Sequence, residues 1–320
     1  MESGTLHNNL LKSIEEQIPE RGNLANIFMD KLDIGKEAAY RRLRGEIPFT
    51  LHEAVTMARE LNISLDHVWN ISSDDNNLFQ FNFVEYIGST EPEYTMIEQF
   101  IDILRFTKND SFSEVGSIEN VFTFALFLNY EYITRFSLFK WQYQYGKTDE
   151  ARCYNEIKIP EKLSKIYNDI ITESKNIRKT HYIWDHMIFT YLVNDIKYFT
   201  KKRLISKKNR QQLKEELLVF IDDLESLTTK GHFDNGNEVY FYISNINFSS
   251  TYSYVQTKNY GMTLISAFTL NSVTSLNPKV LEKMKRWIES VKNTSTLISK
   301  TGEMQRILFF KKQRELINTL

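Results

Sequence analysis

The hydrophobic residues of the first seventy positions follow the spacing of short amphipathic helices. Four of them recur every four residues before Pro19 and share one helical face: Leu6, Leu10, Ile14 and Ile18. After a suitable cap at Asn23, a second run places Ala25, Phe28 and Leu32 at intervals of three and four. The pattern therefore predicts one helix before Pro19 and another after it.

Three more helices are predicted in this part of the chain. One covers about 35–44 and ends at Gly45, a residue that suits the end of a helix. Thr50 and Glu53 have the spacing of a capping box, which predicts the start of the next helix. Ser64 can cap the last, which is short. Five helices are thus expected within residues 1–71.

The polar run SSDDNN at 72–77 has no apolar periodicity and is typical of a linker. Composition changes across it, because only one of the 17 tyrosines, Tyr40, and two of the 22 phenylalanines come before it. The sequence therefore predicts a small domain over 1–71, a linker over 72–77 and a larger domain over 78–320.

The period of the pattern changes within the larger domain. Helical spacing dominates from about 91 to 230, and two further helices are expected near 278–292 and 302–318. Between them, three segments alternate with period two and are separated by short polar breaks: 238–248, 251–258 and 260–270. We expect a mostly α fold, with a five-helix N-terminal domain and a larger helical C-terminal domain that contains a small three-stranded antiparallel β meander.

Composition narrows the class of protein. A hydrophobic content of 42% and a charged content of 25% are those of an ordered globular chain. The most apolar stretch, 121–128, is far shorter than the roughly 20 residues that a bilayer requires, so no membrane partner is expected. The single cysteine, Cys153, suits a reducing compartment, and the acidic first twenty residues do not have a signal-peptide pattern. A cytoplasmic location is expected.

The stretch GKEAAYRRLRGEIPFT at 35–50 gathers three arginines beside Gly45. Together with TLHEAVTMARELNISLD after it, this stretch resembles the end of the recognition helix and the next two helices of the phage lambda repressor-like (Cro-type) helix-turn-helix family. The resemblance covers residues 5–70. It implies a DNA-binding domain over 1–71 whose third helix enters the major groove of double-stranded DNA.

The resemblance also implies which side chains meet DNA. The base-reading positions of the family fall on four residues: Lys36, Glu37, Tyr40 and Arg41. Arg44 would contact phosphate. Arg42 stands where the family usually has a large apolar residue, with Leu43 one step later, and this leaves the register of the helix face open by one residue.

Charge constrains this interpretation. Residues 1–75 contain 8 basic and 13 acidic residues, a net charge of −5, while the remainder of the chain has +4. A DNA-binding domain with this field has to rely on a local basic face. The alternative is a protein-interaction module that keeps a repressor-like fold without binding operators.

The larger domain has little that suggests catalysis. It contains no phosphate-binding glycine loop, no nucleophile elbow and no paired-cysteine spacing. We therefore expect that the protein is not an enzyme, has no catalytic residues, and binds no cofactor and no metal. His181 and His186 flank Asp185 in HYIWDH, but they are five residues apart, which does not put two ligands on one helical face.

Four tyrosines suggest a surface for a small-molecule or peptide effector. Tyr240 and Tyr242 share one face of their expected strand, Tyr252 and Tyr254 share one face of the next, and a hairpin would align all four. The alternative is a half-buried sheet face covered by helices. A small DNA-binding domain joined to this larger one is typical of a transcription regulator that senses an effector and forms a homodimer.

Overall fold

The structure, a computed structural model, describes residues 3–18, 24–61, 63, 65, 68, 79–82, 94, 98, 101–105, 107–108, 110–145, 153–267 and 271–320. Internal packing divides the chain into two compact units, Met1–Leu78 and Phe79–Leu320. The linker predicted over 72–77 lies outside the described residues.

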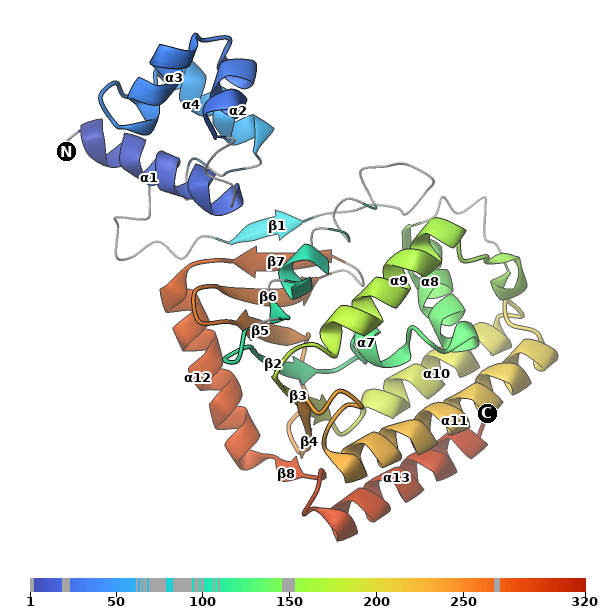
Figure 1. The fold of residues 1–320 in the computed structure, drawn as a ribbon. Helices are drawn as coiled ribbons and strands as arrows, with labels where there is room; N and C mark the ends of the chain where they lie inside the picture. Colours follow the sequence, from blue (N-terminus) through green and yellow to red (C-terminus); the bar gives the residue numbers. More distant parts are fainter. Residues whose placement is uncertain are drawn as a thin grey trace. The chain divides into compact units, whose positions relative to one another are not determined.

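The described helices of the first unit are α1 (Ser3–Gln17), α2 (Leu24–Leu32), α3 (Lys36–Leu43) and α4 (Leu51–Glu60) (Figure 1). Their apolar faces meet in one core, whose buried members are Leu10, Ile14, Leu24, Phe28, Ala39, Met57 and Val68. The capping box is present: Thr50 Oγ1 accepts from the Glu53 amide, and the Glu53 carboxylate accepts from the Thr50 amide. Of the expected fifth helix, only Leu65 and Val68 are described, and both are helical.

The second unit is built on a mixed β-sheet (Figure 1). Its strands are β1 (Gln80–Asn82), β2 (Glu114–Glu119), β3 (Lys179–Asp185), β4 (Glu238–Ser244), β5 (Tyr252–Gln256), β6 (Gly261–Ala267), β7 (Asn271–Ser275) and β8 (Thr296–Leu297). Its described α-helices are α7 (Phe124–Phe127), α8 (Glu131–Tyr145), α9 (Glu161–Ser174), α10 (Ile188–Lys201), α11 (Lys207–Lys230), α12 (Pro278–Thr294) and α13 (Glu303–Asn318), and a 3-10 helix covers Tyr154–Glu156.

Among the described residues the sheet has eight strands in the order β1-β7-β6-β5-β2-β3-β4-β8. The three strands β2, β3 and β4 are parallel, and every other neighbouring pair is antiparallel. Parallel neighbours require long crossover connections, and here α7, α8 and α9 lie between β2 and β3, while α10 and α11 lie between β3 and β4. The fold is therefore of the α/β class.

The prediction of a mostly α fold with a three-stranded meander was wrong. β4 does not pair with β5; it pairs with β3 and β8, while β5 pairs with β2 and β6. The antiparallel meander is β5-β6-β7 instead. The strands β2 and β3 fall within the stretch that was interpreted as helical. Six of the seven β3 residues are buried, and a strand buried on both faces lacks the alternation that marks a half-exposed strand.

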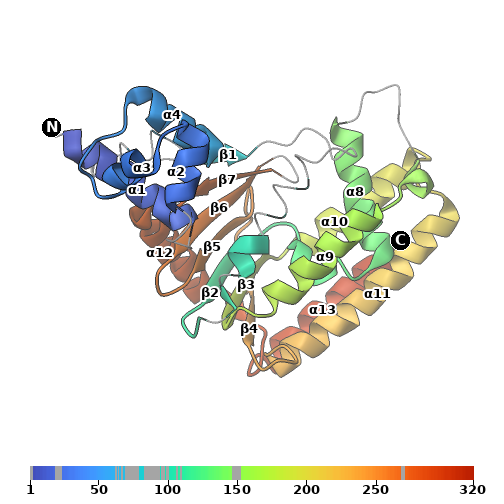
Figure 2. The same ribbon diagram turned by 45° about the horizontal axis from the view of Figure 1, so that its top comes forward.

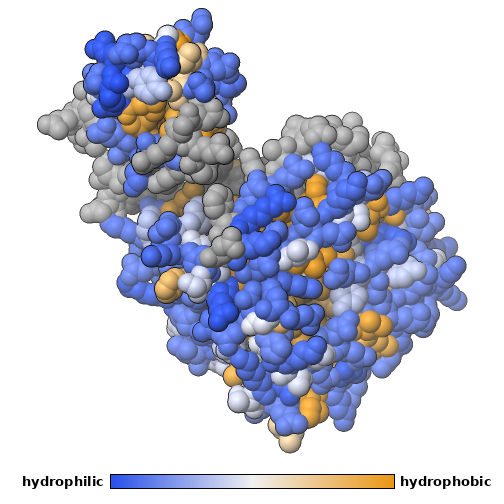
Figure 3. Space-filling view, viewed as in Figure 1, coloured by the Kyte–Doolittle hydropathy of each residue, from blue (hydrophilic) through white to orange (hydrophobic). Residues whose placement is uncertain are grey.

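Helices cover the sheet on both faces, and α12 lies on the opposite side from α8, α9, α10, α11 and α13 (Figures 1 and 2). On the many-helix side, Tyr182, Trp184 and Phe241 from β3 and β4 enter the main hydrophobic core. On the α12 side, Ile288 and Val291 pack against Ile118 and Ile183. On the visible face of the second unit in Figure 3, hydrophobic residues are scattered among hydrophilic ones.

None of the described helices is long and apolar enough to cross a bilayer.

Candidate nucleic-acid interface

The helices α2 and α3 are joined by a tight turn at 33–35. Asp33 has a φ of +51°, in the left-handed region that a short polar side chain tolerates, and it ends α2. The extended backbone of Gly35 then begins α3. At the other end, Gly45 has a φ of +73°, its amide donates to the Arg42 carbonyl, and the Glu46 amide donates to the Arg41 carbonyl. This pair of bonds is a Schellman motif, which fixes the end of the helix.

Arg42 is buried and determines which face of α3 points inward. Its guanidinium makes two bonds to the Glu53 carboxylate, from Nη2 to Oε1 at 2.6 Å and from Nε to Oε2 at 3.1 Å. Nη1 donates to the Ala38 carbonyl at 3.1 Å. The side chains of Arg42 and Glu53 are only 11% and 13% exposed. The arginine thus takes the inward place of an apolar residue because a carboxylate on α4 neutralises it.

His7 of α1 forms hydrogen bonds near the end of α3. Its Nδ1 accepts from the Phe49 amide at 3.1 Å, so Nε2 carries the proton and donates to the Arg42 carbonyl at 2.9 Å. His7 is 5% exposed, and the centroid of its ring lies 4.6 Å from that of the Phe49 ring. His7 therefore links α1 to the end of α3 and to the backbone just before α4.

With Ala39 and Arg42 inward, the other side of α3 faces solvent. The five residues predicted to contact DNA are all exposed: Lys36, Glu37, Tyr40, Arg41 and Arg44. Of the two candidates for the inward position, Arg42 is buried and Leu43 is partly buried against the core of the first unit. Their role as DNA contacts stays a prediction.

The exposed arginines are not isolated cations. Arg44 pairs with Glu46 through Nε and Oε1 at 2.5 Å, and it reaches Glu37 at 3.5 Å. Arg41 Nε lies 3.5 Å from Glu46 Oε2. The sequence pattern did not identify Glu46 as part of this surface, although the helix stop at Gly45 implies that the chain turns back there. The basic face is therefore partly neutralised by its own carboxylates.

The four tyrosines of the second unit share one face of the sheet but do not form a hairpin. In register, Tyr254 lies beside Gly116 of β2, Gly116 beside His181 of β3, and His181 beside Tyr240 of β4. A Cβ on Gly116 would lie 2.4 Å from the Tyr254 ring, so glycine is required by this close approach. The two strands with the tyrosine pairs are separated by β2 and β3.

Tyr254 belongs to the core under α12. It is 1% exposed, and its hydroxyl donates to Glu114 Oε1 at 2.7 Å. Lys285 of α12 donates to the other oxygen of Glu114 at 2.8 Å. The pKa of Tyr254 is raised, mainly by burial and then by the Glu114 charge, so the phenol stays protonated.

The other three tyrosines are partly open to solvent. Tyr240 stacks on His181 with ring centroids 5.2 Å apart, and its hydroxyl donates to Glu238 at 2.9 Å. Tyr252 meets Trp287 edge to face. As an effector surface, Tyr240, Tyr242 and Tyr252 stay a prediction.

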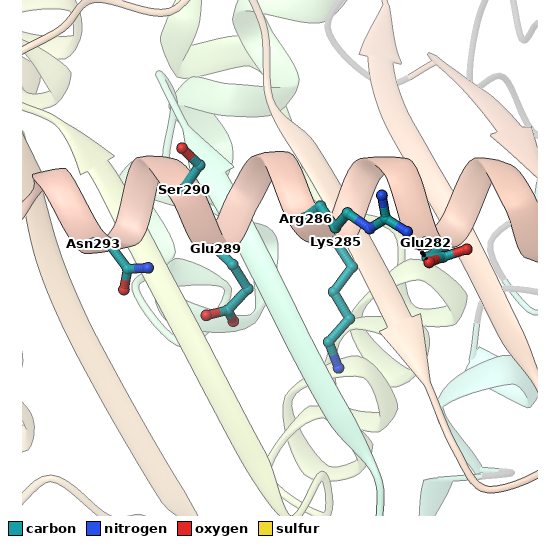
Figure 4. Close-up of a pocket in the computed structure, with 6 residues that line it drawn as sticks. All are labelled: Glu282, Lys285, Arg286, Glu289, Ser290 and Asn293. Atoms are coloured by element: carbon teal, nitrogen blue, oxygen red, sulfur yellow. Dashed lines mark hydrogen bonds and ion pairs between the residues drawn. The ribbon is translucent and has the colours of Figure 1, made fainter.

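Six residues of α12 line a pocket, and Figure 4 shows their side chains in close-up. Its lining consists of Glu282, Lys285, Arg286, Glu289, Ser290 and Asn293. Arg286 pairs with Glu282, Lys285 with Glu114, and Glu289 with Lys292. These charges are neutralised in pairs, as on a helix surface, and do not converge on one point where a reacting group would sit.

The carboxyl edge of the parallel strands, where α/β folds usually bind ligands, is occupied by the chain itself. Asp185 accepts from the Met187 amide at 2.8 Å and from the Phe248 amide at 2.9 Å. Asn120 donates to the Phe248 carbonyl at 3.3 Å. These bonds fasten the connection at 245–251 across the edge, so Asp185 is structural.

His181 does not combine with these groups into a metal site. Burial, more than the nearby Lys292, lowers its pKa to about 4, and the ring is therefore neutral near pH 7. No group of three or more His, Cys, Asp or Glu side chains within the described ranges has an arrangement that could hold a metal ion.

The carboxyl group of Glu119 is also buried. Glu119, at the end of β2, is 0% exposed and accepts from Ser117 Oγ at 2.9 Å and Trp184 Nε1 at 3.1 Å. Burial raises its pKa to about 7, and the hydrogen bonds offset only part of that effect.

No known protein family, characterised protein or solved structure matches this chain.

We expect the change Arg42→Ala to destabilise the first unit by roughly 1–3 kcal/mol, because it leaves the Glu53 carboxylate without its cation in a largely dry setting. Hydrogen exchange of the α3 and α4 amides in the full chain measures the loss. Arg59→Ala, which removes an arginine whose side chain is 75% exposed, is the matched control and should change little. Equal protection in the two variants would show that the pair does not hold α3 in place.

We expect Glu119→Gln to remove a pH dependence of stability. Because the folded-state pKa lies above the ordinary value of 4.5, the folded protein binds more protons between pH 4.5 and 7 than the unfolded chain, and stability falls as pH rises through that range. Urea unfolding at about pH 5 and about pH 8 measures this. Between the two pH values the free energy of unfolding of wild type should fall by roughly 2–3 kcal/mol more than that of the variant.

The contribution of His181 is common to both proteins and cancels in this comparison. Glu161→Gln, a change at a highly exposed carboxylate, should behave as wild type. If the difference in free energy of unfolding between wild type and Glu119→Gln stays constant with pH, Glu119 is ionised in the folded state.

Proposed function

We propose that the chain is a sequence-specific DNA-binding transcription regulator whose α3 reads the major groove. The observation that supports this most is the outward face of α3: five polar side chains capable of base or phosphate contact point away from the core, and Arg42–Glu53 holds them so. The α2-turn-α3 arrangement has the element order of a helix-turn-helix.

The chemistry of the face suits bases and phosphates. Lys36 and Arg41 can donate to guanine O6 and N7, and Glu37 can accept from cytosine N4. Tyr40 is 41% exposed, so its ring is available for apolar contact with a thymine methyl group. Arg44, at the end of the helix, suits a phosphate. Residues 79–320 would then sense an effector, at Tyr240, Tyr242 and Tyr252, or hold a homodimer together, and the protein would act in the cytoplasm.

A protein-interaction module is the second candidate. It is favoured by Leu51 and Val55, which are 80% and 46% exposed on neighbouring turns of α4, and by the carboxylates that neutralise Arg41 and Arg44. Selection of genomic fragments by the full chain at about 50 and about 200 mM salt separates the two candidates. A regulator enriches particular sequences at both salt concentrations, whereas an interaction module enriches none.

We expect two arginines of α3 to have different effects on binding. Arg41→Ala should cost roughly 1–3 kcal/mol of specific binding and relax one base preference, because it removes a base contact. Arg44→Ala should weaken all sequences alike and flatten the salt dependence, because it removes a phosphate contact. Fluorescence anisotropy on selected and scrambled duplexes measures both. Arg59→Ala is the charge-matched control on α4, and effects on binding no larger than its own would place the contact surface elsewhere.

We expect a homodimer that binds inverted repeats, because one short helix reads only a half-site. The centres of the two half-sites should lie about one helical turn of DNA apart, or a multiple of it. Light scattering of the chain alone and with a selected duplex gives the stoichiometry. A monomer at micromolar concentration under both conditions contradicts this prediction.

A further inference from the structure

Glu46 is held over the end of α3 by backbone geometry. Gly45, with its positive φ, reverses the chain, and the Glu46 amide donates to the Arg41 carbonyl at 2.9 Å. The side chain therefore starts from a fixed point directly beside the last turn of the helix. It does not depend on a flexible loop to reach the arginines.

From this point the carboxylate engages both arginines. Oε1 accepts from Arg44 Nε at 2.5 Å and Oε2 from Arg44 Nη2 at 3.3 Å, which is a bidentate contact, while Arg41 Nε lies 3.5 Å from Oε2. The bond from Arg44 lowers the pKa of Glu46, so the carboxylate is ionised at neutral pH. Planar bidentate pairing of this kind is also how a guanidinium binds a phosphate.

We propose that Glu46 is an internal competitor for DNA phosphate: it pairs with Arg41 and Arg44 when the protein is free of DNA, and so lowers the non-specific affinity for DNA. This rests on the proposed function. Non-specific binding is almost entirely electrostatic and has only phosphate contacts to displace Glu46. Specific binding adds base contacts, which offset the cost of breaking the exposed pair.

The energies of the Glu46 ion pair and of a DNA phosphate contact are similar enough for the two to compete. An exposed ion pair contributes little net stability, so DNA can displace Glu46 without a prohibitive cost. Each phosphate contact adds about 0.9 to the slope of log affinity against log salt, which corresponds to roughly tenfold in affinity near 0.1 M salt. Freeing one or both arginines therefore produces a measurable gain.

The test is Glu46→Gln in the full chain, measured by anisotropy on a random-sequence duplex of about 20 base pairs at about 50, 100 and 200 mM salt. We expect binding roughly 5- to 10-fold tighter than wild type near 0.1 M salt, with a slope of log affinity against log salt that is steeper by up to about 0.9. In an Arg44→Ala background, the Glu46→Gln change should produce little gain in affinity. Any gain that remains there comes from Arg41.

Asp30→Asn is the matched control, because it removes one negative charge from the same unit while Lys31 keeps its second partner, Glu60. A gain in Glu46→Gln no larger than in Asp30→Asn overturns the proposal, since it reflects net charge alone, and so does a gain that persists fully without Arg44. If wild type binds the duplex and Glu46→Gln binds equally, only this inference fails. If no variant binds any duplex at low salt, the proposed function fails with it.

Discussion

The orientation of α3 depends on one interaction, the bidentate ion pair between Arg42 and Glu53. Transferring two charges into a mostly dry core is costly unless their remaining hydrogen-bonding groups are satisfied. Here the Ala38 carbonyl and the Thr50 amide satisfy them. Glu53 also belongs to the capping box of α4. The same carboxylate therefore fixes both the rotation of α3 about its axis and the start of α4. With Arg42 inward, the helical period of 3.6 turns positions 36, 37, 40, 41 and 44 outward, and the proposed DNA interface follows from that.

Polar contacts hold two parts of the second unit against its sheet. The connection at 245–251 closes the carboxyl edge of the parallel strands through a hydrogen bond to Asp185. On one face of the sheet, α12 is held by the bond from Lys285 to Glu114. Among the described residues, this leaves partly exposed aromatic side chains without a convergent set of acid, base and nucleophile. A partly exposed aromatic surface suits recognition of a ligand or a second chain, which is the role proposed for the second unit.

Sequence reasoning succeeded where local signals decide the structure. The capping box at Thr50 and the helix stop at Gly45 are as predicted, because each depends on neighbours a few residues away. It failed where distant pairing decides: KTHYIWD forms β3 although Trp184 fits a helical stripe with the residues after it, since a strand between two parallel neighbours is buried on both faces. The burial of Arg42 was also beyond local pattern, because its partner Glu53 lies on another helix.

Whether α3 contacts DNA can be tested by hydrogen-exchange mass spectrometry of the full chain with and without a bound duplex. The duplex is one selected by the chain from genomic fragments, so that binding is established before the contact is mapped. We expect slower exchange in the complex at positions 36–46 and in the part of α2 that adjoins them. Bound DNA that leaves 36–46 unchanged and protects only residues within 79–320 would contradict it.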